Sequence, residues 1–329
     1  MKVLITGGTG FIGSRLVLRC LESGDEVVVY GQENTAAEKE NRKTIEEAGA
    51  TVILASMTDT DALSGAMQGI DVVFHLAAAQ HEANVPDSLF WDVNVKATRQ
   101  ILEIAEKKGV GRFVHGSTIG VYGSALSGDL DESSELMPDN IYGVTKLEGE
   151  KAVLQAGGRL PVVVIRISET YGPGDRRLLK LFKAIDKKAF FMIGDGKNVH
   201  HLIYVDDLID GFLAAAGDDR ALGEVFVLAG KDIVTTNEMV GTIARVLEKK
   251  LLPVRVPLFP MLMVATVMEA VLRPMGIQPP LHRRRMDFFK KGFQFSLKKS
   301  KALLGFEPRH SFYEGVEKTA AWYREQGLL

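Results

Sequence analysis

The chain of 329 residues has a single cysteine, Cys20, so it cannot build a disulfide framework, and a reducing compartment suits it. Its longest apolar stretch, from Phe259 to Leu272, is broken by Pro260 and Glu269. It is shorter than the roughly 20 residues that span a bilayer. A formal net charge of −2 provides no basic field for a polynucleotide. The glycine-rich start is unlike a signal peptide. We therefore expect a cytoplasmic protein with no transmembrane segment and no nucleic-acid partner.

Six short runs of apolar, mostly β-branched residues alternate with helix-period segments in the first half. The runs are Val3–Thr6, Val27–Tyr30, Val52–Ala55, Val72–Leu76, Phe113–Ser117 and Val162–Ile167. They are continuously apolar, as parallel strands covered on both faces should be. Between two of them a helical pattern runs from Phe90 to Ile104. This alternation predicts the α/β class, with a Rossmann-type doubly wound parallel sheet and a smaller C-terminal substrate-binding region.

The alternation stops after the sixth run, and short elements with Pro and Gly turns follow. We therefore expect a dinucleotide-binding Rossmann domain over residues 1–167 and a mainly substrate-binding region over residues 168–329. Segments near residues 202–228, namely Leu202–Leu208 and Val225–Leu228, are expected to return to the main sheet. Ligands of such sheets bind at the carboxyl ends of the strands, where the strand order reverses.

A glycine-rich turn lies between the first predicted strand and a helical pattern. Its sequence is Thr6-Gly7-Gly8-Thr9-Gly10-Phe11-Ile12-Gly13. Gly7 permits a tight turn, Gly10 lets the backbone approach a pyrophosphate, and Gly13 lets the helix pack on the strand. The helix N-terminus offers amide donors and a partial positive charge to phosphates. This strand–turn–helix context indicates a dinucleotide site rather than an unliganded turn.

Tyr142 and Lys146 are four residues apart in a helical segment, so they lie on one face. A free tyrosine has a pKa of about 10, too high for a good base at neutral pH. A fixed ammonium nearby favours the phenolate and lowers the pKa of the tyrosine. By itself this spacing also occurs by chance on surface helices.

Hydroxyl groups follow the fifth predicted strand, in Gly116-Ser117-Thr118-Ile119-Gly120-Val121-Tyr122-Gly123. A hydroxyl at this place can bond a substrate oxygen and stabilise developing negative charge. The alternative is that it only caps a turn. Hydroxyl, tyrosine and lysine in this order behind a glycine motif favour the catalytic interpretation.

These motifs resemble those of the extended short-chain dehydrogenases/reductases, the family of NAD-dependent epimerases and dehydratases and of 3β-hydroxysteroid dehydrogenases. The resemblance covers nearly the whole chain and extends to Tyr171-Gly172-Pro173-Gly174-Asp175 and Tyr204-Val205-Asp206-Asp207-Leu208. It implies that Tyr142 is the general acid/base and that Lys146 is its pKa partner and a ribose contact. Thr118 would be the assisting hydroxyl.

The resemblance also implies cofactor and subunit contacts. Asn94 resembles the helix asparagine that supports the active site, and His75-Leu76-Ala77-Ala78-Ala79 resembles the segment beside the cofactor. The implied cofactor-binding residues are Gly7, Gly10, Phe11, Ile12, Gly13, Gln32, Ser56, Met57, Leu76, Ala77, Ala78, Tyr142 and Lys146. The family commonly forms homodimers through two helices per subunit, here Phe90–Lys108 and the helix that bears Tyr142.

The pattern leaves the choice between NAD and NADP open, with NAD favoured. NAD enzymes usually place an acidic residue at the end of the second strand for the ribose 2′-hydroxyl. Here Gly31 is followed by Gln32. No arginine stands there for a 2′-phosphate, and the nearby Arg15 suits a solvated helix position better. Where the family often holds the adenine with an Asp-hydrophobic pair, the chain has Ser56-Met57.

The candidate substrate contacts depart from those of sugar-nucleotide enzymes. Ile119-Gly120 follow Thr118 where 4,6-dehydratases carry Asp-Glu, so that position offers no acid/base pair for water elimination. Glu169 and His200 stand where nucleotide-sugar epimerases have an asparagine and an arginine that help to hold the diphosphate. A carboxylate beside a diphosphate is repulsive. The candidate substrate contacts are His81, Thr118, Glu169 and His200.

The C-terminal part resembles the 3β-hydroxysteroid dehydrogenase branch more than the epimerases. The residues Met261–Met268 predict an apolar, methionine-rich helix. If this helix covers the pocket, it would suit an apolar substrate. The alternative is that it only packs against the Rossmann domain. The run Arg283-Arg284-Arg285 would suit lipid head groups or an anionic substrate. The adjacent His200-His201 would point to opposite faces of a strand, so we expect no metal site.

Three functions follow from these observations. The first is an NAD(P)-dependent oxidoreductase in which Tyr142 takes the hydroxyl proton of a secondary alcohol while hydride leaves the same carbon, or the reverse. The alternative is a nucleotide-sugar 4-epimerase of the UDP-glucose type, with tightly bound NAD. A third is a non-catalytic NAD(P)-binding redox sensor, which would have no need of the intact set of Thr118, Tyr142 and Lys146.

Overall fold

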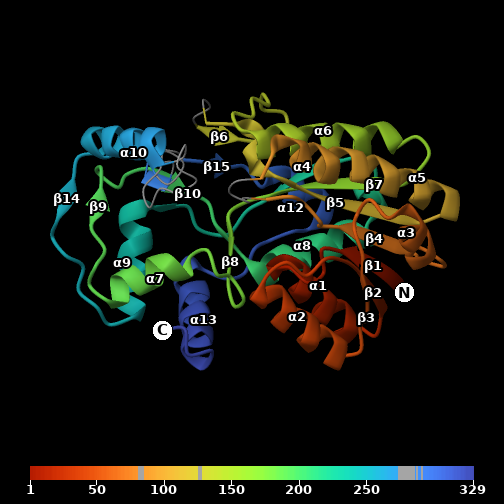
Figure 1. Cartoon of the computed structure of the whole chain (residues 1–329), viewed down its shortest axis with the longest axis horizontal. Coiled ribbons are helices and arrows are strands. Elements are labelled where there is room, and N and C mark those ends of the chain that lie inside the picture. The colour runs from red at the N-terminus through yellow and green to blue at the C-terminus, as the bar shows by residue number, and fades with distance from the viewer. Residues whose placement is uncertain (81–84, 125–127, 273–285, 287, 290–291) are drawn as a thin grey trace.

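A seven-stranded, all-parallel sheet forms the centre of the computed structural model (Figure 1). The structure describes residues 1–80, 85–124, 128–272, 286, 288–289 and 292–329. The sheet has the order β3-β2-β1-β4-β5-β7-β12. Its strands are β1 (Lys2–Thr6), β2 (Glu26–Gly31), β3 (Thr51–Leu54), β4 (Val72–His75), β5 (Arg112–Thr118), β7 (Val162–Ile167) and β12 (Val225–Leu228). The strand order reverses between β1 and β4, so the predicted Rossmann-type fold is confirmed.

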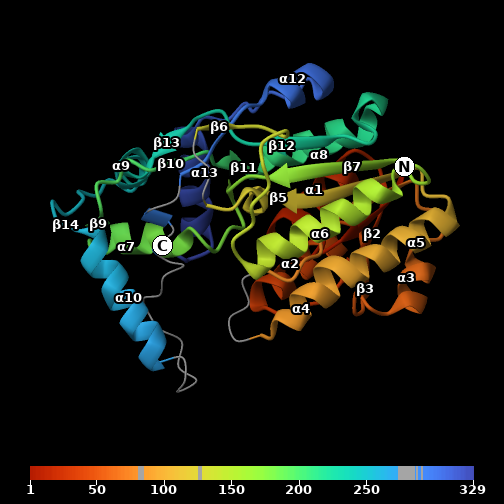
Figure 2. The same cartoon turned by 90° about the horizontal axis from the view of Figure 1, so that it is seen from above.

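Alternate residues of the strands supply two hydrophobic cores, one on each face of the sheet. In β1, Val3 and Ile5 contribute to one core and Leu4 to the other. The first core is covered by α1 (Phe11–Glu22), α2 (Ala36–Glu47), α8 (Val205–Gly217) and α12 (Lys298–Leu304). The second is covered by α3 (Thr60–Ala66), α5 (Thr98–Lys108) and α6 (Ile141–Ala156), with α5 and α6 side by side (Figure 2). This double covering explains why the strands are apolar at successive positions.

The helix predicted over Phe90–Ile104 is confirmed, as part of a longer helical stretch with an unusual centre. It begins as α4 (Asp87–Trp91), continues as a π-helical turn, η1 (Asp92–Ala97), and ends as α5. A π turn is rare and occurs frequently at functional sites. Asn94 lies within this turn.

A smaller region faces the carboxyl ends of the main strands (Figure 1). Its helices are α7 (Leu179–Asp186), α9 (Thr236–Val246), α10 (Leu258–Leu272) and α13 (Phe312–Glu325). Its short strands are β6 (Asp129–Leu130), β8 (Thr170–Tyr171), β9 (Met192–Ile193), β10 (Val199–His200), β11 (Ile203–Tyr204), β13 (Val234–Thr235), β14 (Arg255–Val256) and β15 (Gln294–Phe295). The 3-10 turns η2 (Ile119–Tyr122) and η3 (Asp219–Ala221) complete the described elements. Aromatic side chains fill its core, as where Phe182 meets Tyr323 edge to face at 5.1 Å. Within the described residues, no helix is long and apolar enough to cross a bilayer.

Two expectations about the second half need correction. Val225–Leu228 does join the main sheet, but Leu202–Leu208 adds no strand to it, because β11 pairs with β8 and α8 begins at Val205. Within the part of the chain that the structure describes, the apolar helix α10 neither covers the ends of the main strands nor packs on the Rossmann half. It lies at the far end of the molecule beside β9 and β14, and packs with Ile193 and Met286 (Figures 1 and 2). The run Arg283-Arg284-Arg285 falls outside the described residues.

Candidate active site

The glycine loop joins β1 to α1 at the reversal of strand order. Gly7 has a φ of +70°, and a Cβ on it would lie 2.8 Å from the backbone nitrogen of Ala77. A Cβ on Gly13 would lie 2.2 Å from the carbonyl oxygen of Gly7. Both glycines are therefore required by the protein's own packing. Gly10 differs, because a Cβ there would approach only that same carbonyl oxygen, at 3.3 Å. The space beside Gly10 fits a ligand that comes close to the backbone.

The N-terminus of α1 points its amides into this loop. Its first turn carries no acidic residue, and Gly10 has no side chain with which to cap it. Such a turn offers N–H donors and a partial positive charge to a phosphate. Thr9 Oγ1 donates to the carbonyl of Gln32 at 2.9 Å, which ties the loop to the segment after β2. These residues fit the pyrophosphate of a dinucleotide, and their role as cofactor contacts stays a prediction.

Tyr142 and Lys146 project from the first two turns of α6. The helix begins after Asn140, whose side-chain oxygen accepts from the backbone N–H of Gly143 at 3.0 Å. Lys146 is buried, with 2% exposure, and its ammonium donates to the carbonyl oxygen of Gly116 in β5 at 2.6 Å. Burial lowers the pKa of Lys146 from 10.5 to about 8, against the attraction of Glu150. The ammonium is therefore mostly charged at neutral pH and is held beside the carboxyl end of β5.

Thr118 ends β5 and lies close to Tyr142. A Cβ on Gly120 would contact both the hydroxyl of Thr118, at 3.4 Å, and the ring of Tyr142, at 3.9 Å. Thr118 Oγ1 accepts from the N–H of Gly120 at 3.1 Å. The hydroxyl thus caps η2, as the simpler interpretation proposed, and its own proton is still available to a substrate oxygen. The structure brings the three predicted catalytic residues to one end of β5 and α6.

Asn94 links the strand-four segment to the helix of Tyr142. Its side chain exchanges two hydrogen bonds with the backbone of Ala79, at 2.8 and 3.2 Å, and donates to Thr145 Oγ1 at 3.0 Å. Asn94 is 1% exposed, so it holds these segments without facing solvent. A Cβ on Gly149 would lie 2.5 Å from its carbonyl oxygen, so the π turn and α6 approach closely. Asn94 positions the site through the residue next to Lys146.

A buried ion pair lies one turn beyond Lys146. Glu150 accepts from Arg166 Nη2 at 2.7 Å and from Ser117 Oγ at 2.7 Å, with the two charged side chains 2% and 4% exposed. Arg166 Nη1 donates to the hydroxyl of Tyr122 at 2.8 Å. The network joins β5, α6 and β7 next to the predicted catalytic residues. Sequence reasoning missed it, although a glutamate one turn after Lys146 was a visible signal.

Two histidines beside Lys146 remain neutral. His75 exchanges hydrogen bonds with Thr6 at 2.7 Å and Thr98 at 3.0 Å, and its ring lies 5.3 Å from that of His115. Burial is the main cause that lowers the pKa of both histidines, and the charge of Lys146 is the second. The pKa of His75 falls to about 3, and that of His115 falls well below its ordinary value. They therefore add no positive charge to the site.

The segments expected at the adenosine end lie beside the glycine loop or in the core. Ser56 accepts at its carbonyl oxygen from the hydroxyl of Tyr30 at 2.9 Å, and Met57 is 6% exposed within the second core. Glu33, which sequence reasoning missed, follows Gln32 and pairs with Arg42 at 2.5 Å. An acidic residue two positions after β2 was a signal that could have been found.

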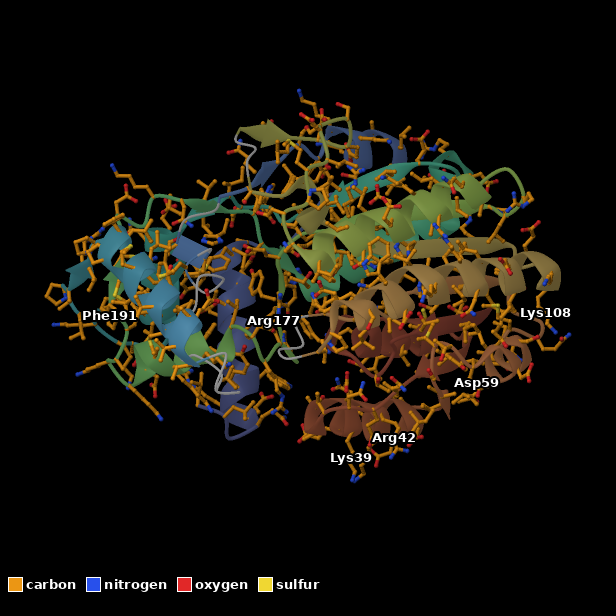
Figure 3. All side chains as sticks on the ribbon, turned by 45° about the horizontal axis from the view of Figure 1, so that its top comes forward. Lys39, Arg42, Asp59, Lys108, Arg177 and Phe191 are labelled. Carbon is orange, nitrogen blue, oxygen red and sulfur yellow. The ribbon has the colours of Figure 1, made fainter. Side chains whose placement is uncertain are left out.

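Glu169 and His200 were named separately as substrate contacts, and the structure makes them partners. His200 Nδ1 lies 3.0 Å from Glu169 Oε2, and Nε2 lies 3.0 Å from Thr236 Oγ1. Partial desolvation by the surrounding protein disfavours the ionised form of Glu169, but its hydrogen bond with His200 and the charges of His200 and Arg177 hold its pKa below the ordinary value. Figure 3 places Arg177 between the sheet and the smaller region. His81 lies outside the described residues.

The glutamate is the exposed member of this pair. The side chain of Glu169 is 43% exposed and that of His200 only 4%, and the His200 ring packs on Phe288 with centroids 4.9 Å apart. The neighbouring His201 is not part of this pair. Its Nε2 forms a hydrogen bond with the carbonyl oxygen of Gly230 at 2.8 Å. The pair therefore presents a carboxylate toward solvent, with the imidazole buried behind it.

A Rossmann sheet with a glycine loop, and with Thr118, Tyr142 and Lys146 at one strand end, defines the extended short-chain dehydrogenase/reductase class. A family model described as "NAD dependent epimerase/dehydratase family" matches residues 3–229. The chain belongs to this family of enzymes.

Known relatives carry several activities. The chain is 30% identical to a dTDP-glucose 4,6-dehydratase of Actinoplanes sp., over 98% of both chains. It is 27% identical to the 3beta-hydroxysteroid-dehydrogenase/decarboxylase isoform 2 of Arabidopsis thaliana, over 96% of this chain and 61% of the relative. The crystal structure of UDP-glucuronic acid 4-epimerase from Bacillus cereus in complex with NAD superposes with a TM-score of 0.82 at 26% identity, over 99% of each chain. The family is thus shown, and its members differ in substrate.

Proposed function

We propose that the protein is an NAD-dependent dehydrogenase or reductase that acts at a secondary alcohol or ketone of a substrate without a nucleoside diphosphate. The single observation that carries this proposal is the 3.0 Å contact of Glu169 with His200. This contact places the carboxylate of Glu169 at the position where nucleotide-sugar epimerases have residues that bind the diphosphate.

The chain's own residues supply the proton chemistry. Tyr142 removes the proton of the substrate hydroxyl, or returns it to the carbonyl oxygen in the reverse direction. The ammonium of Lys146 favours the phenolate form of Tyr142. Thr118 donates a hydrogen bond to the same substrate oxygen and stabilises its developing charge. NAD, when bound, supplies the acceptor or donor of hydride.

The charges around the adenosine end favour NAD over NADP. Glu33 places a carboxylate just after β2. Arg42 is held by Glu33 and by Glu46, at 2.5 and 3.2 Å, and Arg15 pairs with Asp206 at 2.7 Å. A 2′-phosphate would have to compete with these carboxylates for each arginine.

The second candidate is a nucleotide-sugar 4-epimerase. It is supported by the superposition on UDP-glucuronic acid 4-epimerase, whose structure has also been solved with UDP-glucuronic acid and NAD. A dehydratase is less well supported despite the 30% identical relative, because Thr118 is followed by Ile119, which is buried, and by Gly120, neither of which is an acid or base.

Calorimetry with UDP and dTDP distinguishes the two candidates. The NAD-loaded protein should bind neither nucleotide tightly. Replacing the pair, Glu169→Asn with His200→Arg, should strengthen binding by about tenfold or more, because a hydrogen bond to a charged group contributes about 1.5–3 kcal/mol. Glu148→Gln, on the surface of α6, is the control. Micromolar binding of UDP or dTDP by the unchanged protein would favour the epimerase over the dehydrogenase.

A further inference from the structure

Exposed apolar side chains gather at one end of the molecule. Of the fifteen large hydrophobic side chains exposed in the described residues, eight belong to α10 or to the segments beside β9 and β14. They are Phe191, Leu252, Val254, Phe259, Met263, Val264, Val267 and Val271, which we call the apolar end. Met192 N donates to the carbonyl of Val254 at 3.2 Å, and β9 pairs with β14, so these segments are contiguous. Figure 1 shows α10, β9 and β14 together, and Figure 3 shows Phe191 beside α10.

The outward face of α10 presents no charge to solvent. Phe259, Met263, Val267 and Val271 recur every four residues, so they form one stripe, with exposures of 73%, 53%, 57% and 54%. The helix contains one acidic residue, Glu269, which is 7% exposed. A helix of a water-soluble surface carries polar residues on such a face. A contiguous apolar patch of this kind marks an interaction site.

Basic side chains surround the apolar end. Lys187, Lys188, Lys250 and Arg255 are exposed in the segments next to it. Lys249 is paired with Asp186 at 3.1 Å. The exposed acidic residues of the same segments are Glu248 and Asp195. The described residues of this end are therefore net positive, although the whole chain has a formal charge of −2.

We propose that the apolar end docks on the surface of an anionic lipid bilayer, with α10 in the boundary between head groups and acyl chains. The helix has 15 residues, a length of about 22 Å, and is too short to cross an acyl core of about 30 Å. Apolar side chains that enter the boundary, with basic residues at the level of anionic head groups, are the two elements of interfacial binding. The proposal does not depend on the substrate.

Charge selects the bilayer over a second copy of the chain. In a two-fold contact the same surface faces itself, so two net-positive surfaces that carry Lys187, Lys250 and Arg255 would be brought together. Like charges in an interface disfavour association. An anionic lipid surface neutralises the same residues.

Vesicle flotation with the full-length protein tests the proposal. The protein should float with vesicles of phosphatidylcholine mixed with phosphatidylglycerol, more weakly with phosphatidylcholine alone, and less as salt is added. Val267→Asp should lower the partition coefficient by about tenfold or more, since it places a charge on the inserted face. Lys187→Ala and Lys250→Ala should each lower it by about fivefold on anionic vesicles only.

Leu222→Asp is the matched control, because Leu222 is an exposed apolar residue outside the apolar end, at 37% exposure. It should float like the unchanged protein. Circular dichroism and NAD affinity should be unchanged in all four variants. Failure of the folded, unchanged protein to float with anionic vesicles would overturn the proposal. Equal flotation by Val267→Asp would do the same. A dimer that Val267→Asp converts to a monomer, without vesicle binding, would assign the surface to a second copy.

Discussion

The two ends of the site are held in different ways. At the end of β5 and α6, which we call the catalytic end after its predicted role, the polar groups are buried and bonded to the backbone, as Lys146 is to Gly116 and Asn94 is to Ala79. At the substrate end, the side chain of Glu169 is partly exposed, and it is held in place by its hydrogen bond with the side chain of His200. The catalytic end is thus specified by short motifs within single elements. The substrate end depends on residues far apart in the chain, so it can change between relatives that share the chemistry.

The largest effect should come from breaking the catalytic end. Tyr142→Phe removes only the phenolic oxygen and should lower turnover by about 10²–10⁴-fold, the usual contribution of general acid–base catalysis. NAD affinity should be unchanged. Lys146→Ala should lower both turnover and NAD affinity, because its ammonium is assigned to the tyrosine and to the ribose. Steady-state kinetics and calorimetry separate the two patterns, and equal NAD affinity in both variants would remove the ribose assignment.

The glycine loop permits a matched pair of variants. Gly10→Val should weaken NAD binding and should lower thermal stability much less than Gly13→Val does, because a Cβ at Gly10 would meet only the carbonyl oxygen of Gly7, at 3.3 Å. Gly13→Val should unfold the loop, because its Cβ would clash with the carbonyl of Gly7. Calorimetry and thermal melting test the contrast. Unchanged NAD affinity in folded Gly10→Val would show that no ligand lies against this position.

The buried ion pair of Glu150 with Arg166 should change the pH dependence of kcat/KM. Glu150 favours the charged form of Lys146, whose pKa is about 8. Removing the carboxylate lowers this pKa further, so the alkaline fall in kcat/KM should move to lower pH. Glu150→Gln alone leaves Arg166 buried without its partner and should cost about 3 kcal/mol of stability.

The double variant Glu150→Gln with Arg166→Met removes both charges, so no unpaired charge is left buried. The alkaline fall in its kcat/KM should still move to lower pH. Glu148→Gln is the control, because this glutamate pairs with Lys151 at the surface of α6, at 2.7 Å. A pH profile that is unchanged in the folded double variant would reduce the ion pair to a purely structural role.

The sequence predicted the main strands and the proximity of Thr118, Tyr142 and Lys146 because these signals are local, while the catalytic roles of the three residues stay predictions. Five of the six strands were visible because burial on both faces leaves continuous apolar runs, and the edge strand β3 was visible from its apolar sequence although it is only partly buried. The spacing of Tyr142 and Lys146 follows from one helix. The ion pair of Glu150 with Arg166 joins α6 to β7, and periodicity within either element carries no information about it. The same holds for Glu169 and His200, which 31 positions separate.

The smaller region was harder to predict because its strands have two residues each, too few for any period to appear. The position of α10 could not be derived either. An apolar helix is ordinarily buried, and nothing in its pattern distinguishes a covered face from an exposed one. The cofactor residues, the domain limits and the homodimer through α5 and α6 remain predictions.

The most direct test of the central claim is the absorbance of reduced nicotinamide during turnover. Purified protein is mixed with NAD and, in separate reactions, with diphosphate-free secondary alcohols such as sterols and with nucleotide sugars. We expect reduced cofactor to accumulate with an alcohol of the first group, and Tyr142→Phe to abolish that accumulation. Interconversion of a nucleotide sugar with its 4-epimer, without net reduction of the cofactor, would contradict the account.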